Sequence, residues 1–131
     1  MWSYYADGHR GVCLRFRVAG LLRWPNCSPP EPVAYAARYP DIDFFRPRHD
    51  WPDLVTKAAA WRHEREWRMM SRQSGHVAID PDALDGVILG HRIGREVELE
   101  VHEFVDERSP RPQLLRAAPA HREFRLVIQG D

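Results

Sequence analysis

Gly86-Val87-Ile88-Leu89-Gly90 is a short, uniformly apolar run between two glycines. A strand that is buried on both faces has this continuous apolar character, so we expect the run to lie at the centre of a sheet. The residues just before it, 80–84, read Asp-Pro-Asp-Ala-Leu and predict a capped single turn of helix. Residues 76–79, His-Val-Ala-Ile, predict a further strand.

The segments that follow the apolar run predict one helix and two strands. Residues 95–107 fit either an alternating strand or an amphipathic helix. We favour the helix, because glutamates lead this segment and Arg108 follows it, as the helix dipole prefers. Residues 113–117 and 123–128 predict strands that pair across Pro119.

The segments that precede the apolar run are more broken. Residues 12–18 alternate and predict a strand, whereas 20–32 carry four prolines and predict a loop. Residues 33–35, Val-Ala-Tyr, again favour a strand. Pro52 is well placed to begin a helix, and apolar residues recur at helical spacing from there to Trp61.

These elements predict one α+β domain over residues 1–131, with a mixed or mainly antiparallel sheet and two or three short helices. A chain of this length buries about two thirds of its surface on folding. The residues expected in its core are Leu14, Phe16, Leu54, Trp61, Val87, Ile88 and Ile128, with Cys13 as a small core residue.

The composition argues against several functional classes. Apolar residues make up 44% and charged residues 29%, and 19 basic residues balance 19 acidic ones. Zero formal charge argues against a protein that holds nucleic acid or an anionic membrane by bulk charge. No apolar run approaches the roughly 18 residues of a membrane span and no secretory signal is visible, so we expect a cytoplasmic protein. Neither the two cysteines nor the seven histidines show metal-ligand spacing, so no metal is expected.

One stretch, residues 56–68, concentrates polar groups between two tryptophans, and it contains Glu64 and Glu66. In a strand, both carboxylates would point the same way, roughly 7 Å apart at their Cα atoms, and could divide acid–base labour. In a helix they would lie about 200° apart and could not cooperate. The residues from Glu64 onward favour a strand, and Ala58 to Ala60 favour a helix before it. The competing interpretation is a solvated charged surface with ion pairs worth ~0–1 kcal/mol each.

The same stretch carries a family resemblance. The opening Met-Trp-Ser-Tyr-Tyr-Ala-Asp-Gly-His-Arg-Gly-Val-Cys-Leu-Arg-Phe of residues 1–16 resembles the bacterial domain of unknown function 2971 family. Later landmarks agree in order to about Gly90: Val33, Tyr35, Lys57, Trp61, Glu64, Glu66, Trp67, Arg68, Pro81, Leu84 and the apolar run 87–90. The sequence departs at Tyr4, where the family usually has His, and at His63, where it usually has Tyr. Family members also carry an N-terminal portion, so the chain resembles an N-terminally truncated version of a longer domain.

The resemblance implies a bacterial intracellular protein without an established activity, and some members resemble proteins of phage-defence loci. An aromatic residue followed by Glu-x-Glu is similar to the catalytic pattern of ADP-ribosyltransferases. By that likeness Glu66 would be the catalytic carboxylate, Glu64 would orient the acceptor and NAD would be the cofactor. The substrate-binding candidates are Lys57, Trp61, Trp67 and Arg68.

Two non-catalytic functions compete with this one. The favoured function is an interaction module of a defence or toxin pair, in which a protein partner covers the aromatic segment of Trp2, Tyr4 and Tyr5. A nucleic-acid binder is the less favoured one, because the formal charge is zero. It would use interleaved side chains, namely Trp61, Arg62, Arg65, Trp67, Arg68 and Arg72.

Overall fold

The computed structural model describes residues 6–43, 45 and 52–131. The chain forms two compact units, and each is described by itself. The sheet unit comprises Met1–Trp24 and Val77–Asp131, and the inserted unit comprises Pro25–His76. The chain contains helices together with sheets whose strands pair in both antiparallel and parallel directions, which confirms the α+β class. The predicted aromatic segment at Trp2, Tyr4 and Tyr5 lies outside the described residues.

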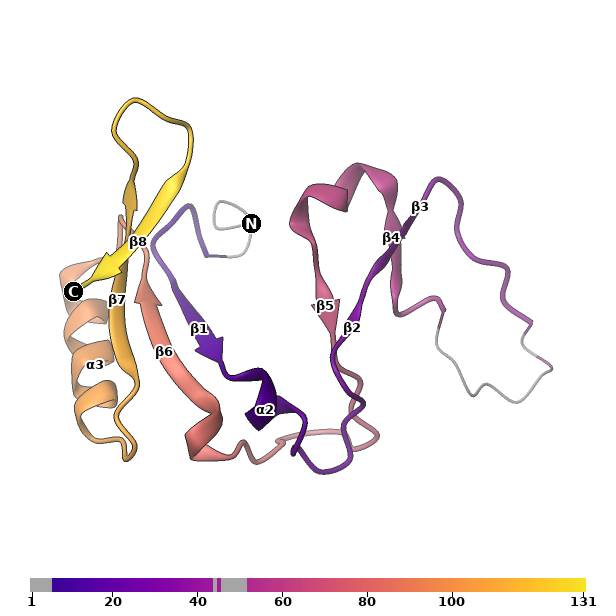
Figure 1. The fold of residues 1–131 in the computed structure, drawn as a ribbon, viewed down its shortest axis with the longest axis horizontal. Coiled ribbons are helices and arrows are strands. Elements are labelled where there is room, and N and C mark those ends of the chain that lie inside the picture. The colour runs from indigo at the N-terminus through magenta and orange to yellow at the C-terminus, as the bar shows by residue number, and fades with distance from the viewer. Residues whose placement is uncertain (1–5, 44, 46–51) are drawn as a thin grey trace. The chain divides into compact units, whose positions relative to one another are not determined.

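The sheet unit is built on a four-stranded sheet with the order β1-β6-β7-β8 (Figure 1). Its strands are β1 (Val12–Phe16), β6 (Leu84–Leu89), β7 (Gln113–Pro119) and β8 (Leu126–Gly130). β1 and β6 are antiparallel, β6 and β7 are parallel, and β7 and β8 are antiparallel. The parallel step needs a crossover, which α3 (Arg95–Asp106) supplies. The predicted central strand and the predicted helix are therefore confirmed. The predicted pairing of the last two strands is also confirmed, but the second strand begins at Leu126 and not at residue 123, and Pro119 is the last residue of β7.

The core of the sheet unit lies where α3 meets the sheet. Leu84, Val87 and Val105 form a buried cluster, and Phe16, Val101 and Leu114 pack against it. Val87 and Leu114 are neighbours across the parallel step, so they present the same face of the sheet to the helix. Burial of these apolar side chains is the main stabilising contribution of this unit.

A short helical corner closes the start of β6. α2 (Val18–Leu21) lies against the 3-10 helix η2 (Pro81–Ala83), and the carboxylate of Asp80 accepts a hydrogen bond from the Asp82 amide at 3.0 Å. The predicted capped turn is confirmed. The contact requires glycine in α2, because a Cβ built on Gly20 would lie 2.5 Å from that of Ala83. The predicted strand over 12–18 ends at Phe16, since Val18 already begins α2.

The inserted unit contains two small strand pairs. β2 (Glu31–Pro32) and β5 (Trp67–Arg68) are antiparallel, and β3 (Ala34–Ala36) and β4 (Thr56–Ala58) are parallel. A 3-10 helix, η1 (Ala59–Glu64), follows β4 directly. The strand predicted at 33–35 is confirmed as β3, shifted by one residue.

Several sequence-based predictions are wrong. The helix expected from Pro52 to Trp61 is replaced by β4 and η1, because pairing with β3 overrides the helical spacing. Residues 76–79 form no strand. Five residues expected in the core are exposed: Cys13, Leu14, Leu54, Trp61 and Ile128. Three of these lie on the edge strands β1 and β8, where a neighbour exists on one side only. Among the described residues, no helix combines the length and apolar character needed to cross a bilayer.

Candidate functional site

The two glutamates of the predicted site lie at a turn between a helix and a strand. Glu64 is the last residue of η1, and Arg65 adopts a left-handed conformation with φ 48° and ψ 45°. Glu66 follows this turn and immediately precedes β5. Neither the regular strand nor the regular helix considered from the sequence is present. The left-handed residue is what brings both carboxylates to one place.

Lys57 on β4 is the cation that these carboxylates share. Its Nζ donates to Oε2 of Glu64 and lies 3.1 Å from Oε2 of Glu66. Glu64 is only 4% exposed and is the one buried charged residue among those described. A buried carboxylate is costly without a cation, so the Lys57 contact is a condition of this local fold.

Arg68 holds Glu66 from its other side. Its Nε lies 2.6 Å from Oε1 and its Nη2 lies 3.2 Å from Oε2, which is the two-pronged geometry of guanidinium on carboxylate. The hydrogen bond from Arg68, reinforced by Lys57, lowers the pKa of Glu66 below its usual value. Arg68 also donates through Nη1 to the backbone carbonyl of Leu54. We call Lys57, Glu64, Glu66 and Arg68 the charge network.

Aromatic residues border the charge network. The backbone amide of Glu66 donates to the Tyr35 hydroxyl at 2.8 Å. This hydrogen bond fixes the position of Glu66, whose carboxylate contacts both Lys57 and Arg68. The Lys57 ammonium lies 5.1 Å from the centroid of the Trp61 ring, within the range of a cation–π interaction. Sequence reasoning assigned no contact to Tyr35. Its position among the landmark residues was the available signal.

The structure brings together five of the six predicted site residues, namely Lys57, Trp61, Glu64, Glu66 and Arg68. Trp67 is the exception, because successive residues of a strand point to opposite faces and Arg68 faces the network. The Trp67 side chain is instead 64% exposed.

The arrangement is well suited to holding segments together and poorly suited to proton transfer. Two cations face two carboxylates, so the charges within the network cancel. A carboxylate whose pKa is lowered is a weak base at neutral pH. Lys57 lies on β4, Glu64 ends η1 and Arg68 lies on β5, with Glu66 directly before β5, so the network joins these three elements.

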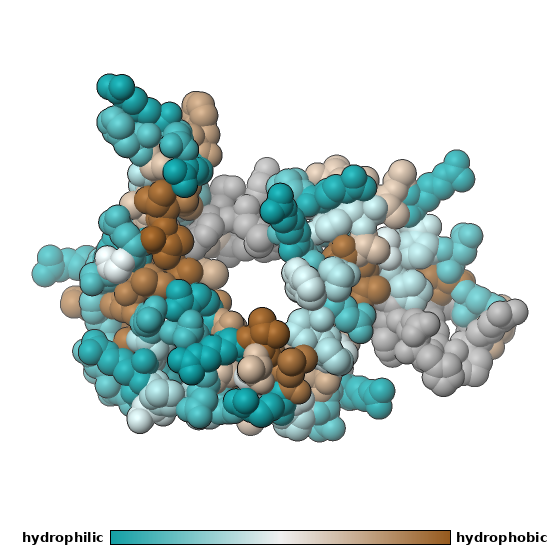
Figure 2. Space-filling model, viewed as in Figure 1, coloured by the Kyte–Doolittle hydropathy of each residue, from teal (hydrophilic) through white to brown (hydrophobic). Residues whose placement is uncertain are grey.

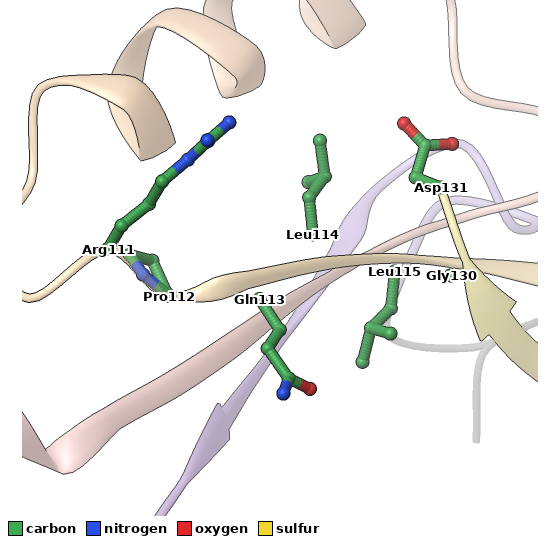
Figure 3. A pocket seen from close by; sticks show the side chains of 7 residues that line it. All are labelled: Arg111, Pro112, Gln113, Leu114, Leu115, Gly130 and Asp131. Atoms are coloured by element: carbon green, nitrogen blue, oxygen red, sulfur yellow. The ribbon is translucent and has the colours of Figure 1, made fainter.

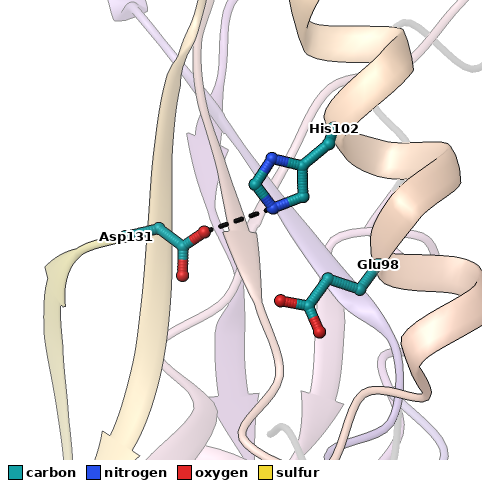
Figure 4. Close-up of side chains that lie close together, drawn as sticks. All are labelled: Glu98, His102 and Asp131. Carbon is teal, nitrogen blue, oxygen red and sulfur yellow. Dashed lines mark ion pairs between the residues drawn. The ribbon is translucent and has the colours of Figure 1, made fainter.

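A second cluster, made of side chains of the types that can bind a metal ion, lies in the sheet unit. Glu98 and His102 of α3 and Asp131 after β8 offer ligand atoms within 4.8 Å of one another (Figure 4). His102 Nε2 lies 3.4 Å from Asp131 Oδ2. The guanidinium of Arg116 contacts both carboxylates of this cluster, with Nε 2.7 Å from Asp131 Oδ1, and these contacts raise the pKa of Arg116. A cation is thus already supplied by the chain itself.

A hollow of about 510 Å³ opens at the same end of the sheet (Figure 3). It is lined by Arg111, Pro112, Gln113, Leu114, Leu115, Gly130 and Asp131. The charged groups on its rim have partners of their own, since Arg111 pairs with Asp106 and Asp131 pairs with Arg116. None of the site residues predicted from the sequence lines it.

The fold and the charge network define an α+β protein with an inserted unit whose segments are joined by ion pairs. Comparison with known families matches residues 1–69, just over half of the chain, to the protein family of unknown function DUF2971. The chain belongs to this family. The matched segment includes every residue of the charge network. No curated protein and no solved structure matches the chain.

Proposed function

We propose that this chain is a non-catalytic module that acts by binding a protein partner. The observation that carries the proposal is that the carboxylates of the charge network are buried or already bound by cations of the chain itself. Both oxygens of Glu66 accept hydrogen bonds from Lys57 or Arg68, and Glu64 is buried. A general base or a carboxylate that stabilises an oxocarbenium-like transition state needs an oxygen that the substrate can reach.

The exposed apolar side chains of the inserted unit favour protein binding. Trp67 presents most of its ring to solvent, and Trp61 and Leu54 are also exposed. Tryptophan and arginine contribute disproportionately to binding energy at protein interfaces. Trp67 sits on β5, whose pairing with β2 fixes the backbone, so little ordering would be needed on association.

The family resemblance suggests the setting of this module. A cytoplasmic defence or toxin pair of a bacterium would supply the partner. The same partner would cover Trp2, Tyr4 and Tyr5, which lie outside the described residues, so this contact stays a prediction. The balance of 19 basic and 19 acidic residues argues against nucleic acid as the partner.

ADP-ribosyl transfer from NAD is the competing function, and the convergence of Glu64 and Glu66 on one cation is the observation that favours it. Turnover of labelled NAD separates the two. We expect neither the wild-type chain nor Glu66→Gln to release nicotinamide above the buffer rate. Release by the wild type that disappears in a folded Glu66→Gln variant would overturn the binding-module proposal.

Partner binding itself is tested with two exposed aromatic residues. Trp67→Ala removes the exposed ring of β5, and Phe124→Ala removes a fully exposed ring of the sheet unit. We expect a protein that the wild type captures from its source cells to bind Phe124→Ala equally and Trp67→Ala at least tenfold more weakly. Equal capture by all three chains would contradict the assignment of the surface.

A further inference from the structure

The two edges of the four-stranded sheet differ in how they are protected. β1 carries a charged residue, Arg15, and a register shift between Arg15 and Phe16. β8 reads Leu-Val-Ile-Gln-Gly and contains no charge, no proline and no register shift. Natural sheets usually protect their edges with charges, prolines or bulges, because an open edge pairs with other strands. The β8 edge lacks every one of these devices.

The hydrogen bonds beyond the ends of β8 show which backbone groups face outward. The Asp131 amide donates to the Leu114 carbonyl, and the Ala120 amide donates to the Arg125 carbonyl. Along an antiparallel ladder, hydrogen-bonded residue pairs alternate with non-hydrogen-bonded pairs. The backbone N–H and C=O groups of the odd-numbered residues of β8 therefore point toward β7. The N–H and C=O groups of Leu126, Ile128 and Gly130 therefore point to the outer edge, where no strand of the described chain lies.

We propose that this edge pairs with β8 of a second copy of the chain, antiparallel and about a two-fold axis at Ile128. In this register Ile128 lies opposite its own copy, and Leu126 lies opposite the partner's Gly130. All three of the resulting pairs are hydrogen-bonded pairs, and they use only the backbone groups that point outward. Two four-stranded sheets then form one continuous sheet.

The side chains along β8 are complementary in the same register. Ile128 is 46% exposed in the single chain, and its counterpart would cover it. Within its own chain Ile128 pairs with Ala117, which lies on the same face of the sheet as Leu115. Figure 3 shows Leu115 pointing away from the α3 side. A Cβ built on Gly130 meets nothing within 4 Å, so the partner's Leu126 has room beside it. Apolar residues gather over β7 and β8 in Figure 2.

Charge argues for a second copy as the occupant. One residue beyond each end of the pairing, Arg125, which pairs with Glu123 of its own chain, lies opposite the partner's Asp131, which pairs with Arg116 of its own chain. The two-fold axis repeats this juxtaposition of opposite charges. Opposite charges across a strand pair are stabilising, and no like charges face each other between these positions. A self-paired strand thus matches in hydrogen bonds, in apolar contacts and in charge, whereas a foreign strand would have to match all three by its own sequence.

Disulfide trapping tests this register directly. In a chain with Cys13→Ser and Cys27→Ser, Ile128→Cys places two thiols opposite each other with Cα atoms about 5.5 Å apart, within the range of a disulfide. The matched control is Gln129→Cys, whose two copies are offset along the strands to about 8 Å, beyond that range. We expect mild oxidation to crosslink Ile128→Cys at least tenfold faster than Gln129→Cys.

Sedimentation gives the second readout. The wild-type chain should sediment at twice its 15.3 kDa mass, and Ile128→Lys should sediment at 15.3 kDa because two ammonium groups would face each other across the axis. A monomeric wild type, a dimer that Ile128→Lys leaves unchanged, or equal crosslinking at 128 and 129 would each overturn the proposal. The trapping result stands even where Ile128→Lys does not fold. Neither readout depends on NAD turnover or on Trp67, so the proposal can fail separately from the proposed function.

Discussion

The sheet unit and the inserted unit are held together by different kinds of interaction. In the described part of the sheet unit no charged or polar residue is buried, and the buried apolar side chains include Ala83, Leu84, Val87, Leu89, Val105 and Ala117. In the described part of the inserted unit the buried residues are Val33 and Glu64, and Glu64 is bound by Lys57. The comparison teaches that this small unit replaces much of a hydrophobic core by the charge network. The stability of the inserted unit should therefore change when a charged side chain is removed or the pH is altered. The stability of the sheet unit should change when the volume of a buried side chain is reduced.

Truncation of an apolar core residue should have the largest effect. Leu89→Ala removes a fully buried side chain of β6 and should lower the free energy of unfolding of the sheet unit by about 3 kcal/mol. Leu99→Ala, on the exposed side of α3, is the matched control and should cost less than about 0.5 kcal/mol. Urea denaturation of both variants measures the difference. Equal losses would show that the sheet unit does not depend on apolar burial.

Removal of the shared cation should have the next largest effect, and it should fall on the inserted unit. Lys57→Met takes away the ammonium that contacts buried Glu64, and we expect a loss of about 2 kcal/mol. Adding Glu64→Gln should recover part of this loss, because the buried charge is then absent. Arg10→Met, which breaks an exposed pair with Asp7, should change stability by less than about 0.5 kcal/mol. Denaturation curves in which Lys57→Met and Arg10→Met coincide would contradict the role of the network.

The pH dependence of stability should distinguish the units more finely. The pKa of Glu66 is lowered in the folded state, so its contribution is complete above the unfolded-state pKa and is lost as pH falls through the folded-state pKa. The inserted unit should therefore lose stability in acid over a range that starts near pH 4.3, the ordinary value for glutamate. Glu66→Gln should flatten this part of the profile. A profile with the same slope in both chains would show that Glu66 is not held in its ionised form.

The smallest effect is expected at the surface that we assign to binding. Trp67→Ala should change the stability of the isolated chain by less than about 0.5 kcal/mol, since the ring is mostly exposed. Thermal melting of the two chains in parallel measures this. A large fall in melting temperature would indicate that Trp67 is a structural residue and would weaken its use as an interface residue.

The sequence was informative where local pattern and tertiary structure agree. The apolar run 86–90 predicted the central strand β6, and the leading glutamates of 95–107 predicted α3. It was misleading at 56–58, because β4 is specified by β3 more than 20 residues earlier and not by its own spacing. The site residues were found through their chemical types and order along the chain. Their geometry was not predictable, since it depends on the left-handed turn at Arg65, a residue without a marked preference for that conformation.

Residue-resolved amide hydrogen exchange on the wild type and Lys57→Met tests most directly whether the charge network holds the inserted unit. The amides of Val33, Ala34 and Glu66 form hydrogen bonds within that unit, and those of Arg17 and Gly90 form hydrogen bonds within the sheet unit. We predict that Lys57→Met accelerates exchange of the first group by about 30-fold, equivalent to 2 kcal/mol, and leaves the second group unchanged. Unchanged protection at Val33, Ala34 and Glu66 would show that the unit is held by something other than its charges, and the network would then again be a candidate for catalysis.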